Sequence, residues 1–148
     1  MVEYQDDGIF PASRDQVWRL LRAHLDPEGI TKIHPRVKSH ALVSQDGDSA
    51  LVRRTIDVRG KLLPSEWRIT SRPPEMSRWE IVTSEGPWTA GSWIENHYTE
   101  APGGTRIQTR GDVKVKVLPF FLPQRPVIRR VFADVDQEDI AYLPRLTP

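Results

Sequence analysis

Five polar residues stand out because they interrupt otherwise apolar stripes of the sequence: Arg54, Asn96, Tyr98, Thr109 and Asp139. A charged side chain that is buried without a partner destabilises a fold strongly, so Arg54 requires Asp139, a ligand anion or a route to water. The first solution is a structural ion pair. The second makes Arg54 an anchor for the polar head of an amphipathic ligand, and the sequence leaves both open.

Under the ligand hypothesis, the polar residues orient the head group while large apolar side chains cover the rest of the molecule. Trp67 and Trp79 supply aromatic surface, although they suit a plain core equally well. The predicted ligand-binding set is Arg54, Trp67, Trp79, Asn96, Tyr98, Thr109, Val131, Phe132, Val135 and Asp139. An enzymatic alternative needs Asp139, Tyr98 or Arg54 as acid, base or oxyanion partner, but the sequence has no strong catalytic signature and we assign no catalytic residue.

Glu95 and His97 share one strand face and have the residue types of an acid–histidine dyad. The same face carries Arg106, Gln108 and Arg110, so the pattern favours a network of surface charges between strands. Trp93 falls on this outer face as well, where an exposed aromatic ring marks a candidate partner surface.

The histidines show no metal-ligand spacing. His34 precedes Pro35, which is typical of a helix end, and His40 falls on the outward side of its strand. A metal site built from His34, His40, Asp46 and Asp48 is a weak alternative. We therefore predict neither a metal nor another cofactor.

The length and composition limit the classes of protein to which this chain can belong. A chain of 148 residues suits one domain, 1–148, with a substantial core, and its net charge of +1 gives no footprint for nucleic acid. The absence of cysteine excludes disulfides and thiolate chemistry. No apolar run is long enough for a membrane span and no signal peptide is recognisable. We expect a soluble cytoplasmic protein, either a monomer or a homodimer.

The stretch from Pro126 to Leu143 has the spacing of a long amphipathic helix. At about 100° per residue, its apolar residues fall on an arc of about 160°; they are Val127, Ile128, Val131, Phe132, Val135, Tyr142 and Leu143. Arginines near the start and acids near the end oppose the helix dipole, so tertiary burial must hold this helix. Asp139 interrupts the apolar arc and faces the same partner.

At the other end of the chain, residues from Val2 to Phe10 are a candidate first strand. Ser13 and Gln16 then fit a capping box that begins a helix. The apolar face of this helix is Val17, Trp18, Leu20, Leu21 and Leu25. A second short helix around Ile30 and Ile33 follows, and the pair is too short to form a domain of its own.

From Val37 onward the pattern alternates with a period of two, which predicts about six consecutive antiparallel strands. Arg54 shares its side of one strand with Val52 and Ile56. The alternation of the last strand continues to Val117, with Gly111 as a candidate bend or bulge. A stiff, proline-rich connector, Pro119, Pro123 and Pro126, then leads to the final helix.

The last hairpin gives the sharpest prediction. A four-residue loop at 101–104 pairs Glu100 with Thr105. The same register places two further pairs across the hairpin, Tyr98 with Ile107 and Asn96 with Thr109.

The expected fold is thus α+β, a curved antiparallel sheet of about seven strands wrapped around the C-terminal helix, with two short helices after the first strand. Several short motifs accompany this order: Phe10-Pro11-Ala12-Ser13, Val17-Trp18, Ile33-His34-Pro35-Arg36-Val37, Gly86 to Gly91 and Pro102-Gly103-Gly104-Thr105. Together they resemble the helix-grip fold of the START, polyketide-cyclase and pollen-allergen-like superfamily, also called SRPBCC. The resemblance covers nearly the whole chain, although each motif alone is weakly specific.

The resemblance implies a hydrophobic cavity between sheet and helix that binds lipids, sterols, polyketides or hormones. Some members of the superfamily catalyse cyclisation or dehydration, and others bind only proteins, so membership implies a pocket more firmly than a reaction. The leading expectation is binding or transport of a small hydrophobic or amphipathic ligand. The alternatives are a polyketide cyclase/dehydratase-like enzyme and a protein-interaction module whose cavity is filled by its own side chains.

Overall fold

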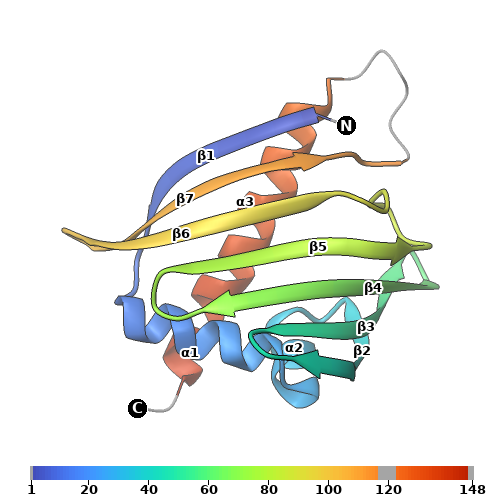
Figure 1. Cartoon of the computed structure of the whole chain (residues 1–148), viewed down its shortest axis with the longest axis horizontal. Coiled ribbons are helices and arrows are strands. Elements are labelled where there is room, and N and C mark those ends of the chain that lie inside the picture. The colour runs from blue at the N-terminus through green and yellow to red at the C-terminus, as the bar shows by residue number, and fades with distance from the viewer. Residues whose placement is uncertain (1, 117–122, 147–148) are drawn as a thin grey trace.

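The computed structural model describes residues 2–116 and 123–146 (Figure 1). Within them the elements follow the predicted order: β1 (Val2–Phe10), α1 (Arg14–His24), α2 (Pro27–Ile33), β2 (Val37–Asp46), β3 (Ser49–Val58), β4 (Lys61–Arg72), β5 (Met76–Ser84), β6 (Trp93–Ala101), β7 (Gly104–Val113) and α3 (Gln124–Tyr142). None of the helices in these ranges combines the length and the apolarity that a membrane crossing requires.

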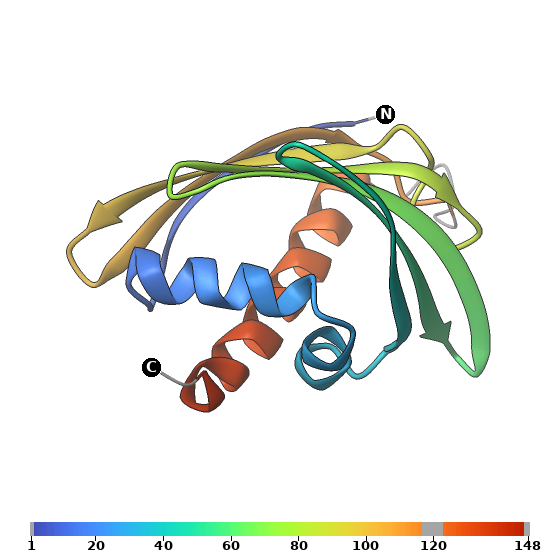
Figure 2. The same cartoon turned by 60° about the horizontal axis from the view of Figure 1, so that its bottom comes forward.

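The seven strands form one antiparallel sheet in the order β1-β7-β6-β5-β4-β3-β2. Strands that are consecutive in sequence lie side by side, except that β1 pairs with β7. The sheet is strongly curved, and all three helices lie on its concave side (Figure 2). This confirms the α+β helix-grip architecture expected from the sequence.

The helix termini explain why the short helices form where they do. The backbone N–H of Gln16 donates to Ser13 Oγ, and the Ser13 N–H donates to the Gln16 side chain, which completes the predicted capping box. Asp26 caps α2 by accepting a bond from the Gly29 N–H. Helix α3 has no side-chain cap and no acid in its first turn, so packing must hold it.

The predicted register of the last hairpin is confirmed at every pair: Glu100 with Thr105, Tyr98 with Ile107 and Asn96 with Thr109. The last strand itself is shorter than predicted and ends at Val113. Beyond it the chain leaves β6 and pairs with residues 87–89, where the Thr89 N–H donates to the Lys114 carbonyl and Val115 bridges Trp88. Val117 and Pro119 lie outside the described residues.

The side of the sheet on which the β2 residue His40 lies differs from the prediction. The pairing of β2 with β3 shifts register between Val37 and Ser39, as at a β-bulge. An extra residue in one strand turns every following side chain to the other face of the sheet. His40 is therefore buried beside its β3 partner Arg54, and the expectation that it points outward is wrong.

Candidate functional site

Arg54 lies on the concave face of β3, and only 7 % of its surface is exposed. Its Nε–H donates to His40 Nδ1 at 3.0 Å, and an Nη2–H donates to the carbonyl of His24 at 3.0 Å. The guanidinium carbon lies 5.9 Å from the ring centre of Trp67 and 5.5 Å from that of Trp79. Two aromatic faces and two neutral acceptors thus surround a buried cation.

No carboxylate in the described parts of the chain forms an ion pair with Arg54. Burial lowers the pKa of Arg54 to about 10, the direction expected when a positive charge is desolvated without a nearby negative charge. Its neighbour His40 accepts from Arg54 and is therefore neutral, and burial together with the Arg54 charge lowers the pKa of His40 to about 4. His40 Nε2 is buried and has no hydrogen-bond partner within the described residues.

Asp139, on α3, does not pair with Arg54 but with two histidines. Its Oδ1 lies 2.9 Å from His24 Nε2 at the end of α1 and 3.1 Å from His34 Nε2 at the end of α2. The structural pair between Arg54 and Asp139 that the sequence allowed is therefore absent from the described residues; Arg54 binds the backbone carbonyl of His24, and Asp139 binds the His24 ring.

The pKa values of the two histidines are shifted in opposite directions. His34 contacts Asp139 through Nε2 and Glu138 through Nδ1, at 3.1 Å in each case, so both ring nitrogens donate to carboxylates. Burial pulls the pKa of His34 down, but its bonds to Asp139 and Glu138 outweigh that effect and raise the pKa. In His24 burial dominates and the pKa falls. The bonds from both rings lower the pKa of Asp139 in spite of its own burial.

A second group of polar residues lies across the concave face of β5, β6 and β7. Tyr98 and Ser77 share a hydrogen bond of 2.6 Å between their hydroxyls, and the Trp79 indole N–H also donates to Ser77. Thr109 donates to Asn96 at 2.6 Å. Burial raises the pKa of Tyr98 to about 12, so at neutral pH this residue is an uncharged donor and not a base.

Helix α3 is fully buried at only two residues, Ile128 near its start and Asp139 near its end. Ile128 packs with Tyr4 and Val113. Between these two points the residues that face the site, Val131, Phe132 and Val135, are only half-buried. The middle of α3 thus covers the sheet loosely.

The space between this part of α3 and the sheet is small. An apolar recess of about 30 Å³ is lined by Trp67, Trp79, Trp88, Phe132 and their neighbours. Pockets that hold drug-sized ligands measure about 300–1,000 Å³. Seven of the ten predicted ligand-binding residues nevertheless keep part of their surface accessible, namely Trp67, Trp79, Asn96, Thr109, Val131, Phe132 and Val135. The recess is therefore narrow in this arrangement, and these residues are not sealed from solvent.

The outer face of the sheet carries the predicted charge network. Glu95 accepts bonds from His97, Arg110 and Arg78. Arg78 also stacks over Trp93, 4.1 Å from the ring centre. A broad, open depression of about 740 Å³ lies over polar residues of β1, β6 and β7 on this side, with too few apolar walls to suggest a ligand site.

The two histidines of the inner site, His24 and His34, were not among the predicted site residues. His24 follows Val17 and Leu20 at spacings of seven and four, which places it on the buried face of α1, and that signal was readable. His34 was recognised as a helix-end residue, but its meeting with His24 depends on how α1, α2 and α3 pack together. Asp46 and Asp48, which the weak metal alternative grouped with His34, lie at the β2–β3 turn, where Asp48 pairs with Arg72.

These features define a helix-grip protein: a curved sheet around a long helix, with aromatic and polar side chains lining the space between them. The family model described as "Polyketide cyclase / dehydrase and lipid transport" matches residues 1–143, and the chain belongs to this family and to the SRPBCC superfamily. A comparison with curated proteins finds no match.

Several solved structures share the fold. Ara h 8.0201 is 17 % identical, with a TM-score of 0.73, and the match covers 97 % of this chain and 98 % of that one. The Zhui aromatase/cyclase from Streptomyces sp. R1128 is 17 % identical, with a TM-score of 0.63 over 98 % and 90 % of the two chains. A START superfamily protein from Mycobacterium smegmatis is 18 % identical, with a TM-score of 0.63 over 97 % and 96 %. At these identities the similarity concerns the fold.

Proposed function

We propose that this protein binds a small amphipathic molecule with an anionic head, and that Arg54 holds that head. One observation carries the proposal: a guanidinium buried to 7 % exposure, between two tryptophans, with no carboxylate partner among the described residues. A buried ion without a counter-charge is unfavourable, and a ligand carboxylate or phosphate would relieve that cost.

The guanidinium has donors left for such a ligand. Arginine carries five N–H groups, of which one binds His40 and one binds the His24 carbonyl. Charge-assisted bonds from arginine to an oxyanion are about twice as strong as neutral hydrogen bonds. The neutral acceptors also fix the plane of the guanidinium, so its position is set before a ligand arrives.

The apolar part of the ligand would lie between Trp67, Trp79 and the half-buried face of α3. The recess there is far too small for a lipid or polyketide in the present arrangement, so binding requires the middle of α3 to move away from the sheet. Its half-burial supports such a movement, because few apolar contacts would be lost. Lipid transport in the family's description also supports a ligand of this kind.

The same contacts favour binding over catalysis. Tyr98 is held neutral, with a pKa of about 12, and the Asp139 carboxylate is occupied by two histidines. Neither group is free to act as the base that a cyclase/dehydratase mechanism needs. The enzymatic alternative therefore has less support here than a carrier or sensor.

The test compares the affinities of two probes, dodecanoate and dodecanol, which have the same alkyl chain and different head groups. Binding is measured by tryptophan fluorescence and calorimetry. Wild-type protein should bind dodecanoate about 10–100-fold more tightly, the range expected for hydrogen bonds to a charged group. Arg54→Met should abolish that preference. Arg53→Met is the matched control, because Arg53 directly precedes Arg54 on β3 and is exposed on the other face of the sheet.

The result would contradict the proposal if the two probes bound equally to wild-type protein, or if Arg54→Met kept the preference with its circular dichroism unchanged. Failure of both probes to bind would also contradict it, and would favour a protein-interaction module with a filled interior.

A further inference from the structure

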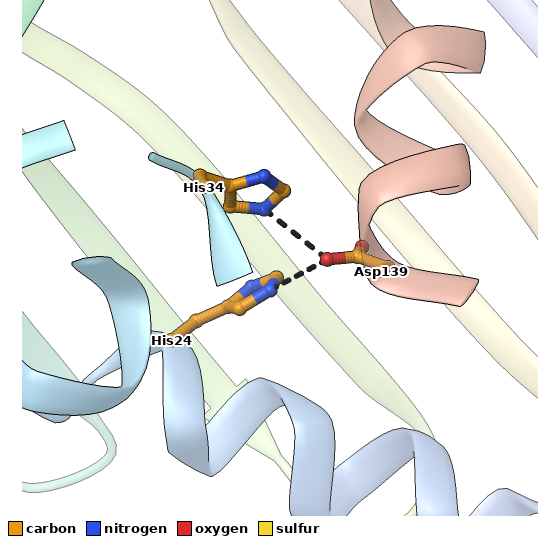
Figure 3. Close-up of side chains that lie close together, drawn as sticks. All are labelled: His24, His34 and Asp139. Atoms are coloured by element: carbon orange, nitrogen blue, oxygen red, sulfur yellow. Dashed lines mark hydrogen bonds and ion pairs between the residues drawn. The ribbon is translucent and has the colours of Figure 1, made fainter. Parts of the chain in front are cut away.

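The rings of His24 and His34 converge on the carboxylate of Asp139, and each of the three residues comes from a different helix or helix end (Figure 3). His24 is the last residue of α1, His34 caps the end of α2, and Asp139 lies near the end of α3. One donor atom from each residue lies within 4.8 Å of the other two. Two imidazoles and one carboxylate thus meet at a single point inside the fold.

The geometry points to a binding site for a divalent transition-metal ion, with His24 Nε2, His34 Nε2 and an Asp139 oxygen as ligands. Imidazole nitrogen and carboxylate oxygen are the donors that Zn²⁺ and Fe²⁺ take in three-ligand protein sites. With metal–ligand bonds of about 2.0–2.1 Å, two ligands of a tetrahedral ion lie about 3.3 Å apart. The two nitrogens are 2.9 Å and 3.1 Å from Asp139 Oδ1, and the three donor atoms lie within 4.8 Å of one another. Binding therefore requires the two rings to close around the ion, which replaces the protons that the Nε2 atoms share with Asp139.

Glu138 gives one of the ligands the support that metal-bound histidines usually have. Its Oε2 lies 3.1 Å from His34 Nδ1, and its Oε1 accepts from Arg36 at 3.5 Å. When the Nδ1–H of His34 donates to Glu138, the ring is fixed and its Nε2 points at the cluster. A carboxylate behind a ligating histidine holds the correct tautomer and raises the basicity of the ring.

A purely structural cluster explains this arrangement less well. Apolar contacts would suffice to join three helix ends, whereas here two buried ionisable groups, His24 and Asp139, meet a third that is partly buried, His34. Buried polar clusters of this kind are often no more stable than apolar packing of the same volume. Their concentration at one point inside a fold is more typical of a functional site.

Three protein ligands leave coordination positions for water or for a small molecule. The ring of Trp79 packs edge-on against His24 at 6.2 Å and also faces Arg54. The Trp79 ring would therefore form one wall of both the metal site and the Arg54 site. The metal site does not depend on the amphipathic ligand proposed above, and each can be tested without the other.

The first experiment uses unmodified wild-type protein, freed of metal by dialysis against a chelator and labelled with ¹⁵N at histidine. Zn²⁺ is added while the ring nitrogens of the four histidines are followed by NMR. We expect the Nε2 signals of His24 and His34 to move together and to saturate at one ion per chain. If only His97 responds, or if no ring responds, the proposal is wrong.

The second experiment measures Co²⁺ affinity by absorption spectroscopy in three variants. Asp139→Asn should weaken binding at least about 100-fold, and Glu138→Gln about 10–100-fold, the usual effect of losing an outer carboxylate. His97→Gln is the matched control, because His97 also touches a carboxylate, Glu95, at 2.7 Å but belongs to no three-residue ligand group within 2–116 and 123–146. Equal affinity in all three variants would overturn the proposal.

Discussion

His24 and Asp139 are separated by 115 residues in the sequence and meet at 2.9 Å, from Nε2 to Oδ1. The bond joins the end of α1 to the end of α3, and His34 adds the end of α2 at the same oxygen. Because α3 has no side-chain cap, this carboxylate is the polar anchor of its C-terminal half, as Ile128 is the apolar anchor near its start.

Replacing Asp139 with alanine should lower the free energy of unfolding by about 3–5 kcal/mol, the range for breaking one side of a buried charged pair. The variant leaves the Nε2 atoms of His24 and His34 without their shared acceptor, although His34 Nδ1 keeps Glu138. Urea denaturation measures the loss. Asp134→Ala, at an exposed position of the same helix, should change stability by less than about 0.5 kcal/mol. Equal effects of the two changes would contradict the anchoring role.

Replacing Asp136 with asparagine should stabilise the protein at neutral pH. Desolvation and the charges of Asp139 and Asp6 raise the pKa of Asp136 to about 6, although its side chain keeps contact with solvent. An acid with a raised pKa in the folded state lowers stability as pH rises from its unfolded value through the folded one. Asp136→Asn removes that loss, so a gain of about 0.5–1 kcal/mol, reduced by solvent screening, is expected at pH 7.

The pH dependence distinguishes this explanation from a general effect of the substitution. The gain of Asp136→Asn should shrink below pH 6 and vanish below about pH 3, where the wild-type carboxyl is protonated in both the folded and the unfolded state. Thermal unfolding of the wild-type and Asp136→Asn proteins across this pH range measures the gain in stability. A gain that is constant with pH would mean that the charge is not its cause.

Replacing Gly111 with alanine should destabilise the sheet by about 1–3 kcal/mol, as overpacking does. A Cβ at Gly111 would lie 2.1 Å from the backbone oxygen of Trp93, which cannot move without breaking the β6–β7 pairing. Gly8→Ala is the control in the adjacent strand, because a Cβ there meets nothing within 4 Å. Chemical denaturation should separate the two variants, and equal stability would refute the steric argument.

The hydrogen bond between Tyr98 and Ser77 should couple the effects that substitutions at these two residues have on the free energy of unfolding. Tyr98→Phe removes one hydroxyl from a buried pair at 2.6 Å and should destabilise the fold by about 1 kcal/mol. In a double-mutant cycle with Ser77→Ala, we expect a coupling of at least about 0.5 kcal/mol, since the two side chains touch. Strict additivity would show that the hydroxyls contribute independently.

Most of the structural features that could be predicted from the sequence depend on local patterns. The capping box at Ser13, the register of the β6–β7 hairpin and the apolar arc of α3 each depend on residues close together in the chain. Period and turn length fix such features before any tertiary contact forms. The bulge in β2 has no comparable signal, and missing it reversed the expected side of His40.

The sequence by itself determined the order of elements, the side of the sheet on which Arg54 lies and the presence of an acid on the inner face of α3. Only the tertiary structure decided which groups these charges contact. Asp139 pairs with His24 and His34, while Arg54 donates to neutral acceptors and packs against two tryptophans. The physical reason is that periodicity specifies the face on which a side chain lies, whereas its partner depends on how separate segments pack across the concave sheet.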